Sequence, residues 1–184
     1  MSEIIGFSTS RLLIRDLNWD DLGFIHSLHS IPDVQEYATL DIPKSLTESK
    51  EYLRKFIDKR TYPRKEYGFC ICLINRKPIG LIGLSTGLDK FRKAELWFKL
   101  KPECWGNGYT TEAANALLAF GFKNILLHRI EAGVATKNLA SIKVLEKIGM
   151  KREGTRRMIL PIRGEWKDNF HYAILEEEFI DHTP

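Results

Sequence analysis

Two spacings of apolar residues alternate along the chain, one with the period of a strand and one with the period of a helix. Short runs that are rich in β-branched and aromatic residues predict six to seven strands, at residues 11–15, 67–74, 79–84, 94–100, 128–135, 150–160 and 166–175. A polar segment with Asn75 and Pro78 separates the second run from the third and predicts a hairpin loop.

Apolar residues three or four positions apart predict about four helices, of which two lie in the first third of the chain. The first helix follows Asn18, a capping residue, and we expect it to stop at Pro32. The second follows Ser45, which forms a capping-box pattern with Glu48. Pro63 is expected to close that segment.

Two longer helices are predicted later, at about 109–124 and at 138–148, the second ended by Gly149 at its C′ position. The order of elements is a strand, two helices, a β meander and then a β-α-β-α-β-β succession. This order predicts an α/β (α+β) fold with a single mixed, largely antiparallel sheet. No repeat or linker divides the chain, so we expect one domain over 1–184 with its core at about 8–176.

The composition is that of an ordinary globular protein and narrows the function classes. Of the 184 residues, 43% are apolar and 28% are charged, which excludes a disordered chain and a collagen-like chain. No apolar run reaches the roughly 18 residues that a membrane span requires. Residues 1–5 lack the basic and apolar regions of a secretory signal, so we expect a cytoplasmic protein without a membrane partner.

Cysteine and charge add little chemistry. The three cysteines, Cys70, Cys72 and Cys104, lack Cys-x-x-Cys spacing, so we expect neither a disulfide framework nor a metal site. Cys70 and Cys72 share one face of a strand and are expected to be buried thiols. The net charge of +4 permits an anionic ligand, while the basic stretches 54–65 and 151–157 indicate a solvated surface rather than a nucleic-acid site.

The most informative segment joins the strand at 94–100 to the helix at 109–124 through Gly106-Asn107-Gly108. Glycine allows a positive φ and lets a ligand approach the backbone closely. The free N–H groups of the first helical turn then form an anion site that suits a pyrophosphate. The same spacing also fits a plain connection between strand and helix, because Gly-x-Gly is a common motif.

A second segment of interest begins with Asn138, after the strand at 128–135. An asparagine at this point serves as an N-cap, and a cap at the mouth between two diverging strands can also contact a ligand. Lys143 and Lys147 are four residues apart and share the exposed face of the following helix.

Taken together, these segments resemble the GNAT superfamily of acyl-CoA N-acyltransferases, and within it the RimJ/RimL-type N-acetyltransferases. The resemblance extends from Arg11 to about Leu175 and so covers nearly the whole chain. The motifs that carry it are Arg11-Leu12-x-x-Arg15, Pro78-Ile79-Gly80, Ala94-Glu95-Leu96, Trp105 to Ala113, Asn138-x-x-Ser141, Lys143 to Met150, Glu153-Gly154 and Asp168-x-x-x-Tyr172. It implies acetyl-CoA as the cosubstrate, bound where the strand at 94–100 splays from the strand at 128–135.

The resemblance also implies which residues hold acetyl-CoA. Backbone groups of the first strand would hold the pantetheine arm, the glycine turn would hold the pyrophosphate, and the start of the next helix would line the wall near the thioester. The residues expected in these roles are Phe98, Lys99 and Leu100, then Gly106, Asn107, Gly108, Tyr109 and Thr110, then Asn138 and Ser141, with Lys143 and Lys147 as partners of the phosphates on their charge.

For catalysis, the resemblance implies Glu95 as the base, directly or through a water, and Ser141 as the group that protonates or holds the leaving thiolate. Both residues have a structural alternative. Glu95 can pair with a lysine on the sheet, and Ser141 can be a third helical residue that satisfies the backbone. Residues expected at the acceptor side are Trp19, Phe24, Tyr37 and His171.

The reaction implied is transfer of an acetyl group to a primary amine, which must be neutral to attack. At pH 7, deprotonating a lysine-like amine of pKa about 10.4 costs roughly 4–5 kcal/mol, whereas deprotonating an α-amine of pKa about 8 costs about 1 kcal/mol. We expect a protein N-terminal α-amine as the acceptor, with a polyamine or amino sugar as the alternative. A CoA-binding module without turnover is a second alternative, since Leu145 stands where many members have a tyrosine acid. A homodimer is compatible with the resemblance.

Overall fold

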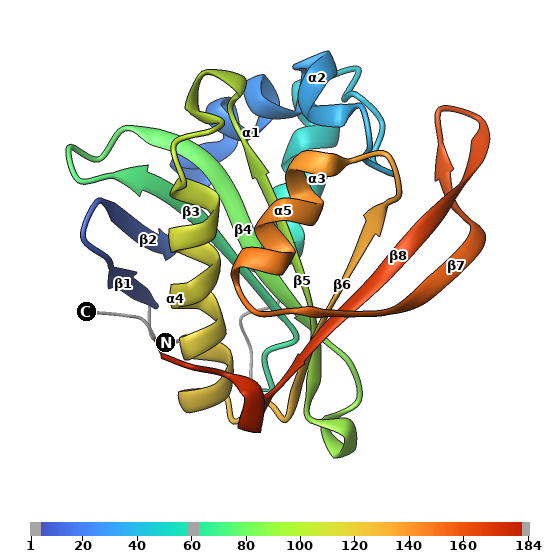
Figure 1. The fold of residues 1–184 in the computed structure, drawn as a ribbon. Helices are drawn as coiled ribbons and strands as arrows, with labels where there is room; N and C mark the ends of the chain where they lie inside the picture. The colour runs from blue at the N-terminus through green and yellow to red at the C-terminus, as the bar shows by residue number, and fades with distance from the viewer. Residues whose placement is uncertain (1–4, 59–62, 182–184) are drawn as a thin grey trace.

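A computed structural model describes residues 5–58 and 63–181 and centres on one eight-stranded sheet (Figure 1). The strand order is β1-β2-β3-β4-β5-β6-β8-β7. The strands are β1 (Gly6–Ser8), β2 (Leu12–Asp16), β3 (Glu66–Leu73), β4 (Pro78–Thr86), β5 (Lys93–Leu100), β6 (Arg129–Ala135), β7 (Lys151–Ile162) and β8 (Glu165–Leu175). Neighbouring strands pair antiparallel, except that β5 and β6 pair in parallel. The expected mixed, largely antiparallel sheet is therefore confirmed.

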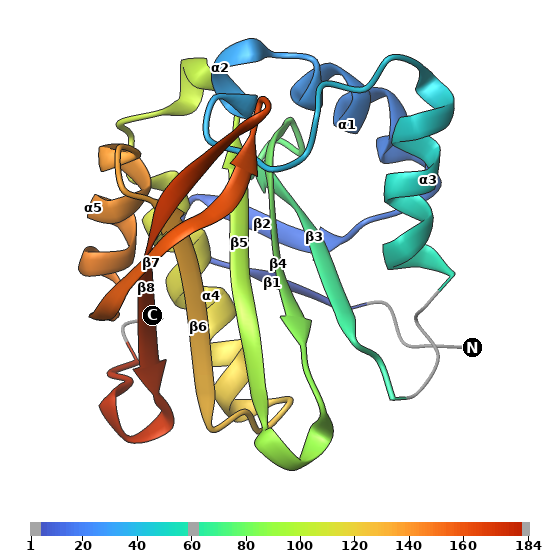
Figure 2. The same ribbon diagram turned by 90° about the vertical axis from the view of Figure 1, so that its right-hand side faces the viewer.

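Five helices cover the sheet in two layers (Figures 1 and 2). The helices are α1 (Leu22–His29), α2 (Pro32–Gln35), α3 (Leu46–Ile57), α4 (Tyr109–Lys123) and α5 (Leu139–Lys147). The apolar residues of α1 and α3 bury one face of the sheet, and those of α4 and α5 bury the other. None of the helices in the described ranges has the length and apolar character needed to cross a bilayer.

Strand periodicity divides the core between the two layers. In β3, Phe69 and Ile71 face α4, while Cys70 and Cys72 face α1 and α3. The expected burial of this thiol pair is confirmed, and the two sulfur atoms lie 3.6 Å apart. Because both faces of the central strands are covered, β3 and β4 are apolar along most of their length.

Local capping signals explain where the helices begin and end. The Asn18 side chain caps a 3₁₀ turn that leads into α1, and Ser45 Oγ accepts from the backbone N–H of Glu48 at 3.3 Å. Gly149 has φ +84° directly after α5, as expected for a C′ glycine. Pro32 was expected only as a stop, and the structure corrects this: it also opens α2, because a proline fits the first turn of a helix.

The predicted counts of strands and helices are each too low by one. The additional strand is β1, which has three residues and pairs only with β2. The additional helix is α2, whose four residues are too few to show a helical stripe. Neither element is long enough to show a pattern in the spacing of apolar residues: β1 is defined by its backbone pairing, and α2 is a single helical turn.

Three expectations concern segments at the margins of the description. Residues 1–4 and 59–62 lie outside the described residues, and these hold parts of the N-terminal signal argument and of the basic stretch 54–65. The helix expected to close by Pro63 is α3, which ends at Ile57. A 3₁₀ turn of three acidic residues, Glu176–Glu178, follows β8. Glu178 pairs with Lys151 of β7, so this turn is held against the sheet.

A close contact between β4 and β5 fixes the position of an indole ring. Trp97 of β5 lies over Gly83 of β4, and its ring centroid is 5.5 Å from that of Phe56 in α3. A Cβ atom at Gly83 would come within 2.3 Å of the indole and 2.4 Å of the Tyr67 carbonyl oxygen. Only glycine leaves room for this packing.

Replacing Gly83 by alanine is therefore expected to lower the free energy of unfolding by about 1–3 kcal/mol, because the indole must move. Gly23 is the control, since a Cβ there meets nothing within 4 Å and the residue is helical. Gly23→Ala is expected to leave stability unchanged or raise it by up to about 1 kcal/mol. Thermal and urea unfolding measure both variants, and equal stability of the two would contradict the packing argument.

Candidate active site

The two parallel strands at the centre of the sheet separate after a short paired stretch. β5 and β6 pair only through residues 93–95 and 129–131. Beyond that point β5 stays with β4 as far as Leu100, and β6 stays with β8 as far as Ala135. Figure 1 shows the two strands diverging. Within the described sheet, the facing edges of the two arms lack a strand partner, although the Leu100 carbonyl at the end of the first arm accepts from Trp105 Nε1 at 2.8 Å.

The first arm ends in the glycine turn that was singled out in the sequence. Gly106 has φ +75° and Gly108 has φ +78°, the left-handed conformation that favours glycine. The Asn107 side chain braces the turn by donating to the Trp105 carbonyl at 3.0 Å. Gly108 is the N-cap of the 15-residue helix α4, and no side chain caps the first N–H groups. The structure thus has the glycine turn and the uncapped helix start that the sequence predicted, while the binding of a pyrophosphate there stays a prediction.

A partly exposed ion pair between Arg11 and Glu112 ties this turn to the N-terminal segment that leads into β2. Arg11 donates through Nη1 to the Asn107 carbonyl at 3.0 Å, and its guanidinium lies 4.7 Å from the ring centre of Tyr109. The Glu112 carboxylate, in the first turn of α4, accepts from Arg11 Nε at 2.6 Å and from Thr9 Oγ1 at 2.5 Å. Burial opposes the charge of Glu112, but these hydrogen bonds outweigh it and lower the pKa of Glu112. Arg11 thus connects the glycine turn to the first turn of α4.

The second arm ends at the N-terminus of α5. Asn138 is its N-cap, with Oδ1 accepting from the Ser141 backbone N–H at 3.1 Å. Ser141 is therefore the third helical residue, as its structural alternative required. Lys143 and Lys147 lie exposed on the outer face of α5. The coenzyme contacts expected of these four residues stay a prediction.

Glu95 lies at the point where the two arms separate, paired across the sheet with Glu131 of β6. Its side chain is exposed on the sheet face opposite to α4. The lysine that could have paired with it, Lys93, contacts Glu131 instead, at 3.2 Å. Glu95 forms no ion pair with another described residue, so the alternative of a sheet ion pair is wrong. Its carboxylate is available for proton transfer.

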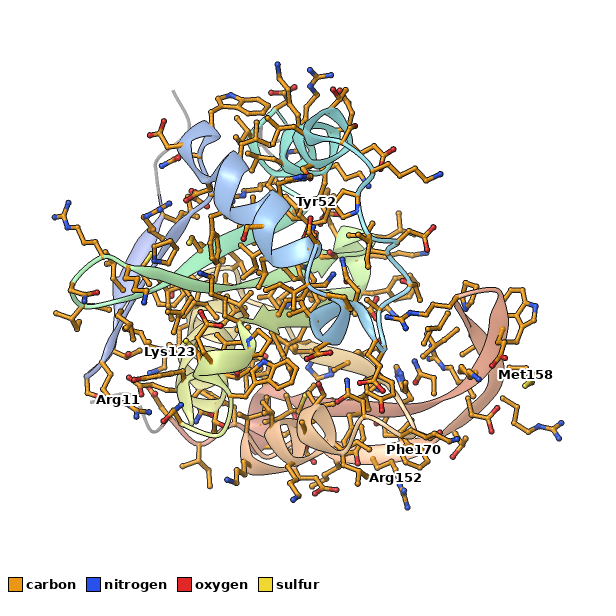
Figure 3. All side chains as sticks on the ribbon, turned by 90° about the horizontal axis from the view of Figure 1, so that it is seen from above. Arg11, Tyr52, Lys123, Arg152, Met158 and Phe170 are labelled. Atoms are coloured by element: carbon orange, nitrogen blue, oxygen red, sulfur yellow. The ribbon has the colours of Figure 1, made fainter. Side chains whose placement is uncertain are left out.

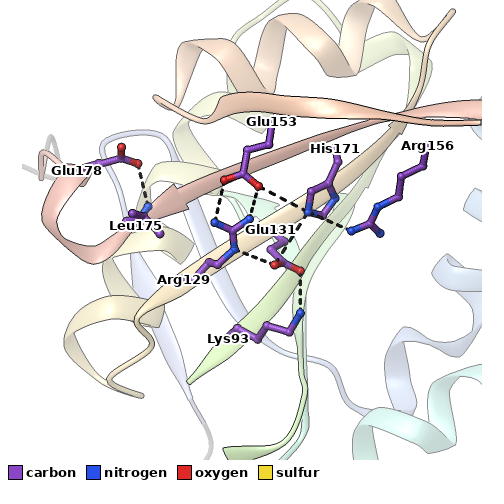
Figure 4. Close-up of polar contacts among 8 residues, drawn as sticks. All are labelled: Lys93, Arg129, Glu131, Glu153, Arg156, His171, Leu175 and Glu178. Carbon is purple, nitrogen blue, oxygen red and sulfur yellow. Dashed lines mark hydrogen bonds and ion pairs between the residues drawn. The ribbon is translucent and has the colours of Figure 1, made fainter. Parts of the chain in front are cut away.

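A charged network fills the same sheet face beside Glu95 (Figure 4). Arg129 Nη1 donates to Glu153 at 2.9 Å, and Arg129 Nε donates to Glu131 at 2.7 Å. His171 lies 4.0 Å from both carboxylates. Burial and then Arg156 lower the pKa of His171, so it is neutral near pH 7. The network has its own partners, which identifies it as a structural brace of β6, β7 and β8.

A cavity of about 560 Å³ opens beyond the end of β6, between the segment after α2 and the β7–β8 hairpin. Figures 2 and 3 show this hairpin projecting from the sheet, with Met158 on it. Arg163 holds the hairpin by donating to the Pro32 carbonyl at 3.3 Å. The lining includes Glu36, Tyr37, Ala135, Thr136, Lys137, Met158, Ile162, Arg163, Glu165, Trp166, Lys167 and Asp168.

The cavity tests the residues expected at the acceptor side. Tyr37 lines it, but Trp19, Phe24 and His171 do not. Trp19 lies instead under Lys50, Phe24 lies under a lysine side chain at the end of β5, and His171 belongs to the charged network. Trp19 and Phe24 thus contact lysine side chains away from the cavity.

Sequence reasoning missed what the Lys99 side chain does. Phe98 points to the α4 layer, and Lys99, next to it, points to the opposite layer. Lys99 Nζ donates to Gln35 Oε1 of α2 at 2.6 Å. Burial lowers the pKa of Lys99 to about 8. No local signal in the sequence identifies this contact, because the partner of Lys99 is 64 residues away.

Comparisons with known proteins agree with this geometry. The family described as acetyltransferase (GNAT) domain matches residues 11–151. An uncharacterised N-acetyltransferase of Bacillus subtilis, YnaD, is 34% identical over 174 residues, which are 94% of this chain and 98% of the relative.

Two solved structures share the fold over nearly their whole length. An acetyltransferase (GNAT family) from Bacillus anthracis has a TM-score of 0.82 and 32% identity, covering 95% of this chain and 100% of that one. Spermidine N-acetyltransferase from Vibrio cholerae, in complex with CoA and spermine, has a TM-score of 0.82 and 28% identity, covering 92% and 98%.

Removal of the Glu112 carboxylate, which is partly buried beside the glycine turn, is expected to destabilise the protein in a pH-dependent way. Glu112→Gln should lower the free energy of unfolding by about 1.5–3 kcal/mol at pH 7, since hydrogen bonds to a charged group are lost. A carboxylate whose pKa is lowered by folding stabilises above its unfolded pKa of about 4.3 and loses this as the pH falls through its folded value. The difference from wild type should therefore shrink below about pH 4.

Urea unfolding at several pH values measures this difference. The control is Glu103→Gln, at a side chain that is 60% exposed, where a change within about 0.5 kcal/mol is expected. A difference for Glu112→Gln that does not depend on pH would contradict the role assigned to its charge.

Proposed function

We propose that this chain, which belongs to the GNAT family of acetyltransferases, transfers an acetyl group from acetyl-CoA to the α-amine of a protein or peptide N-terminus. The family and the names of its relatives make the chain an acetyl-CoA-dependent acetyltransferase. The family and these names therefore favour an enzyme over a CoA-binding module without turnover. The RimJ/RimL type and the α-amine acceptor are the finer parts of this proposal.

In this proposal the coenzyme would bind between the two arms of the sheet. Backbone groups of residues 98–100 would bind the pantetheine amides, because that edge of β5 lacks a strand partner. The N–H groups of Gly106 to Thr110 would bind the pyrophosphate, with the dipole of α4 behind them. Asn138 and Ser141 would lie near the thioester on the opposite arm. Lys143 and Lys147 would reach the phosphates from α5 on their charge.

The chemistry needs one proton acceptor and one proton donor. The neutral amine attacks the thioester carbonyl carbon, the carbon–sulfur bond breaks, and the thiolate leaves. Glu95, which has no ionic partner in the described structure, would take the proton from the amine, directly or through a water. Ser141 would donate a hydrogen bond to the leaving sulfur from the N-terminus of α5.

One observation carries the choice of acceptor. The Lys99 ammonium lies on the same sheet face as Glu95 and forms no ion pair with any described carboxylate. An acceptor that brings further positive charge would be repelled there. An N-terminal α-amine brings a single amine, which needs only about 1 kcal/mol to become neutral. This favours an N-terminus over a polyamine.

A polyamine is the second candidate, because the relative from Vibrio cholerae is a spermidine N-acetyltransferase. The cavity offers some support through the carboxylates of Glu36, Glu165 and Asp168. Two of these are already engaged: Glu165 pairs with Lys167, and Asp168 accepts from the Met158 backbone N–H at 2.9 Å. Of the three carboxylates, Glu165 and Asp168 therefore already have partners within the hairpin, which limits the attraction of the cavity for a polycation.

Substituting Gly108 tests the placement of the pyrophosphate. At about 100 times its Kd, acetyl-CoA should add about 2.7 kcal/mol to wild-type stability, a rise in Tm of roughly 5–10 °C. Gly108→Ala strains the turn at a positive φ and should reduce this rise strongly. Gly164→Ala is the matched control. Gly164 also has a positive φ, +77°, at the tip of the β7–β8 hairpin, and an added Cβ atom there would meet no other atom within 4 Å. An undiminished rise for Gly108→Ala would place the coenzyme elsewhere.

Steady-state release of CoA tests the acceptor and the base together. Wild type should have a higher kcat/KM for a short peptide with a free α-amine than for spermidine. Glu95→Gln should lower kcat for that peptide by about 10²–10⁴-fold while acetyl-CoA still raises the Tm. Glu131→Gln is the matched control, since this carboxylate is held by Arg129 and Lys93. Its kcat is expected to stay close to wild type.

Two outcomes would count against the proposal. A clear preference for spermidine would replace the N-terminus with a polyamine as the acceptor. An unchanged kcat in Glu95→Gln would remove Glu95 from proton transfer.

A further inference from the structure

A polar cluster is buried between β5 and the two short helices that cover it. Lys99 Nζ donates to Gln35 Oε1 at 2.6 Å, and Lys99 also lies close enough to His29 of α1 to influence its pKa. Gln35 is 2% exposed and His29 is 1% exposed. The lysine side chain is largely buried as well. Among described residues, no carboxylate lies within ion-pair distance of this ammonium.

Two further polar atoms in the cluster lack a partner. They are Gln35 Nε2 and His29 Nε2, both fully buried. Because the Lys99 ammonium can only donate, it fixes the amide of Gln35 with its oxygen toward Lys99 and its NH₂ group free beside it. An unpartnered buried group lowers stability, and an unpaired buried charge lowers it more.

The donors of the cluster match the acceptor oxygens of a carboxylate. The ammonium has donors to spare, and Gln35 Nε2 adds two more. Burial and then Lys99 lower the pKa of His29 to about 3, so His29 is neutral and contributes no charge. A carboxylate would give the ammonium its counter-charge and would accept hydrogen bonds from both donor groups.

We propose that Lys99 and Gln35 bind a carboxylate of the acceptor, so that the acceptors of this enzyme are N-termini with an acidic side chain close to the α-amine. The inference rests on the proposed function, because it assigns the specificity of the same site.

The dimensions of the strand agree with such an acceptor. Glu95 and Lys99 lie on one face of β5, four residues apart, which corresponds to about 13 Å between their Cα atoms. An extended peptide advances about 3.3–3.6 Å per residue. An α-amine at Glu95 therefore allows a Glu or Asp side chain at the second or third position to reach Lys99. Gln35 directly precedes Glu36, which lines the cavity.

The test compares four-residue peptide amides that carry Glu, Gln or Lys at the second or third position. Wild type should prefer Glu over Lys by about 10- to 100-fold in kcat/KM. Lys99→Met should abolish this preference, whereas Lys99→Arg should keep its order, since arginine retains the charge and the donors. Lys101→Met is the matched control, because Lys101 already has Glu103 at 3.8 Å and should leave the preference unchanged.

A second readout does not need turnover. Glutarate, a dicarboxylate without an amine, is titrated into each protein with and without CoA, and its binding is measured by calorimetry. Wild type, Lys99→Arg and Lys101→Met should bind it, and Lys99→Met should bind it at least about 10-fold more weakly. Removing an unpaired buried charge should not unfold the protein, and thermal unfolding verifies that Lys99→Met is folded.

The outcomes separate the possibilities. Equal glutarate binding by wild type and Lys99→Met, or a preference for Glu that survives Lys99→Met, would overturn the inference. Equal slowing of all peptides by Lys99→Met and Lys99→Arg, with unchanged glutarate binding, would also overturn it and would make Lys99 the proton acceptor. If no peptide is acetylated but glutarate binding depends on Lys99, the anion site is supported and the N-terminal acceptor fails.

Discussion

The separation of two parallel strands is the constraint on which the rest of the site depends. β5 and β6 share only three register pairs, and each then stays with its antiparallel neighbour. The divergence leaves two facing edges of backbone donors and acceptors that must find partners elsewhere. It also carries the ends of the two arms to the N-termini of α4 and α5, where further N–H groups are free. One departure from regular pairing thus creates a long run of backbone binding groups.

The alternation of side chains along β5 assigns different tasks to the two faces of the same strand. Leu96 and Leu100 bury against α4, which keeps the helix and its glycine turn in place. Glu95, Trp97 and Lys99 point the other way: Trp97 packs against Phe56 of α3, Lys99 contacts Gln35 of α2, and Glu95 is exposed. Packing and chemistry are therefore coupled through one strand, and a register shift of one residue would exchange them.

Much of this arrangement could be predicted because the signals are local. Strand runs, capping residues and the Gly106-Asn107-Gly108 turn are each encoded within a few neighbouring residues, and the structure has them close to the expected positions. What could not be predicted depends on partners far apart in sequence. Glu112 is 101 residues from Arg11, and Lys99 is 64 residues from Gln35. No spacing rule within one segment reveals such a pair.

The burial of Lys99 is what gives the site its power to discriminate between acceptors. At an effective dielectric constant of about 20, two unit charges roughly 6 Å apart interact by about 3 kcal/mol, whereas in bulk water the value falls below about 1 kcal/mol. The sign is opposite for a second ammonium of a polyamine and for a carboxylate of a peptide. The two acceptors therefore differ by several kcal/mol through this one side chain, provided that it stays buried. Gln35 of α2 lies against it, so under the proposal this four-residue helix would help to set the charge of the substrate.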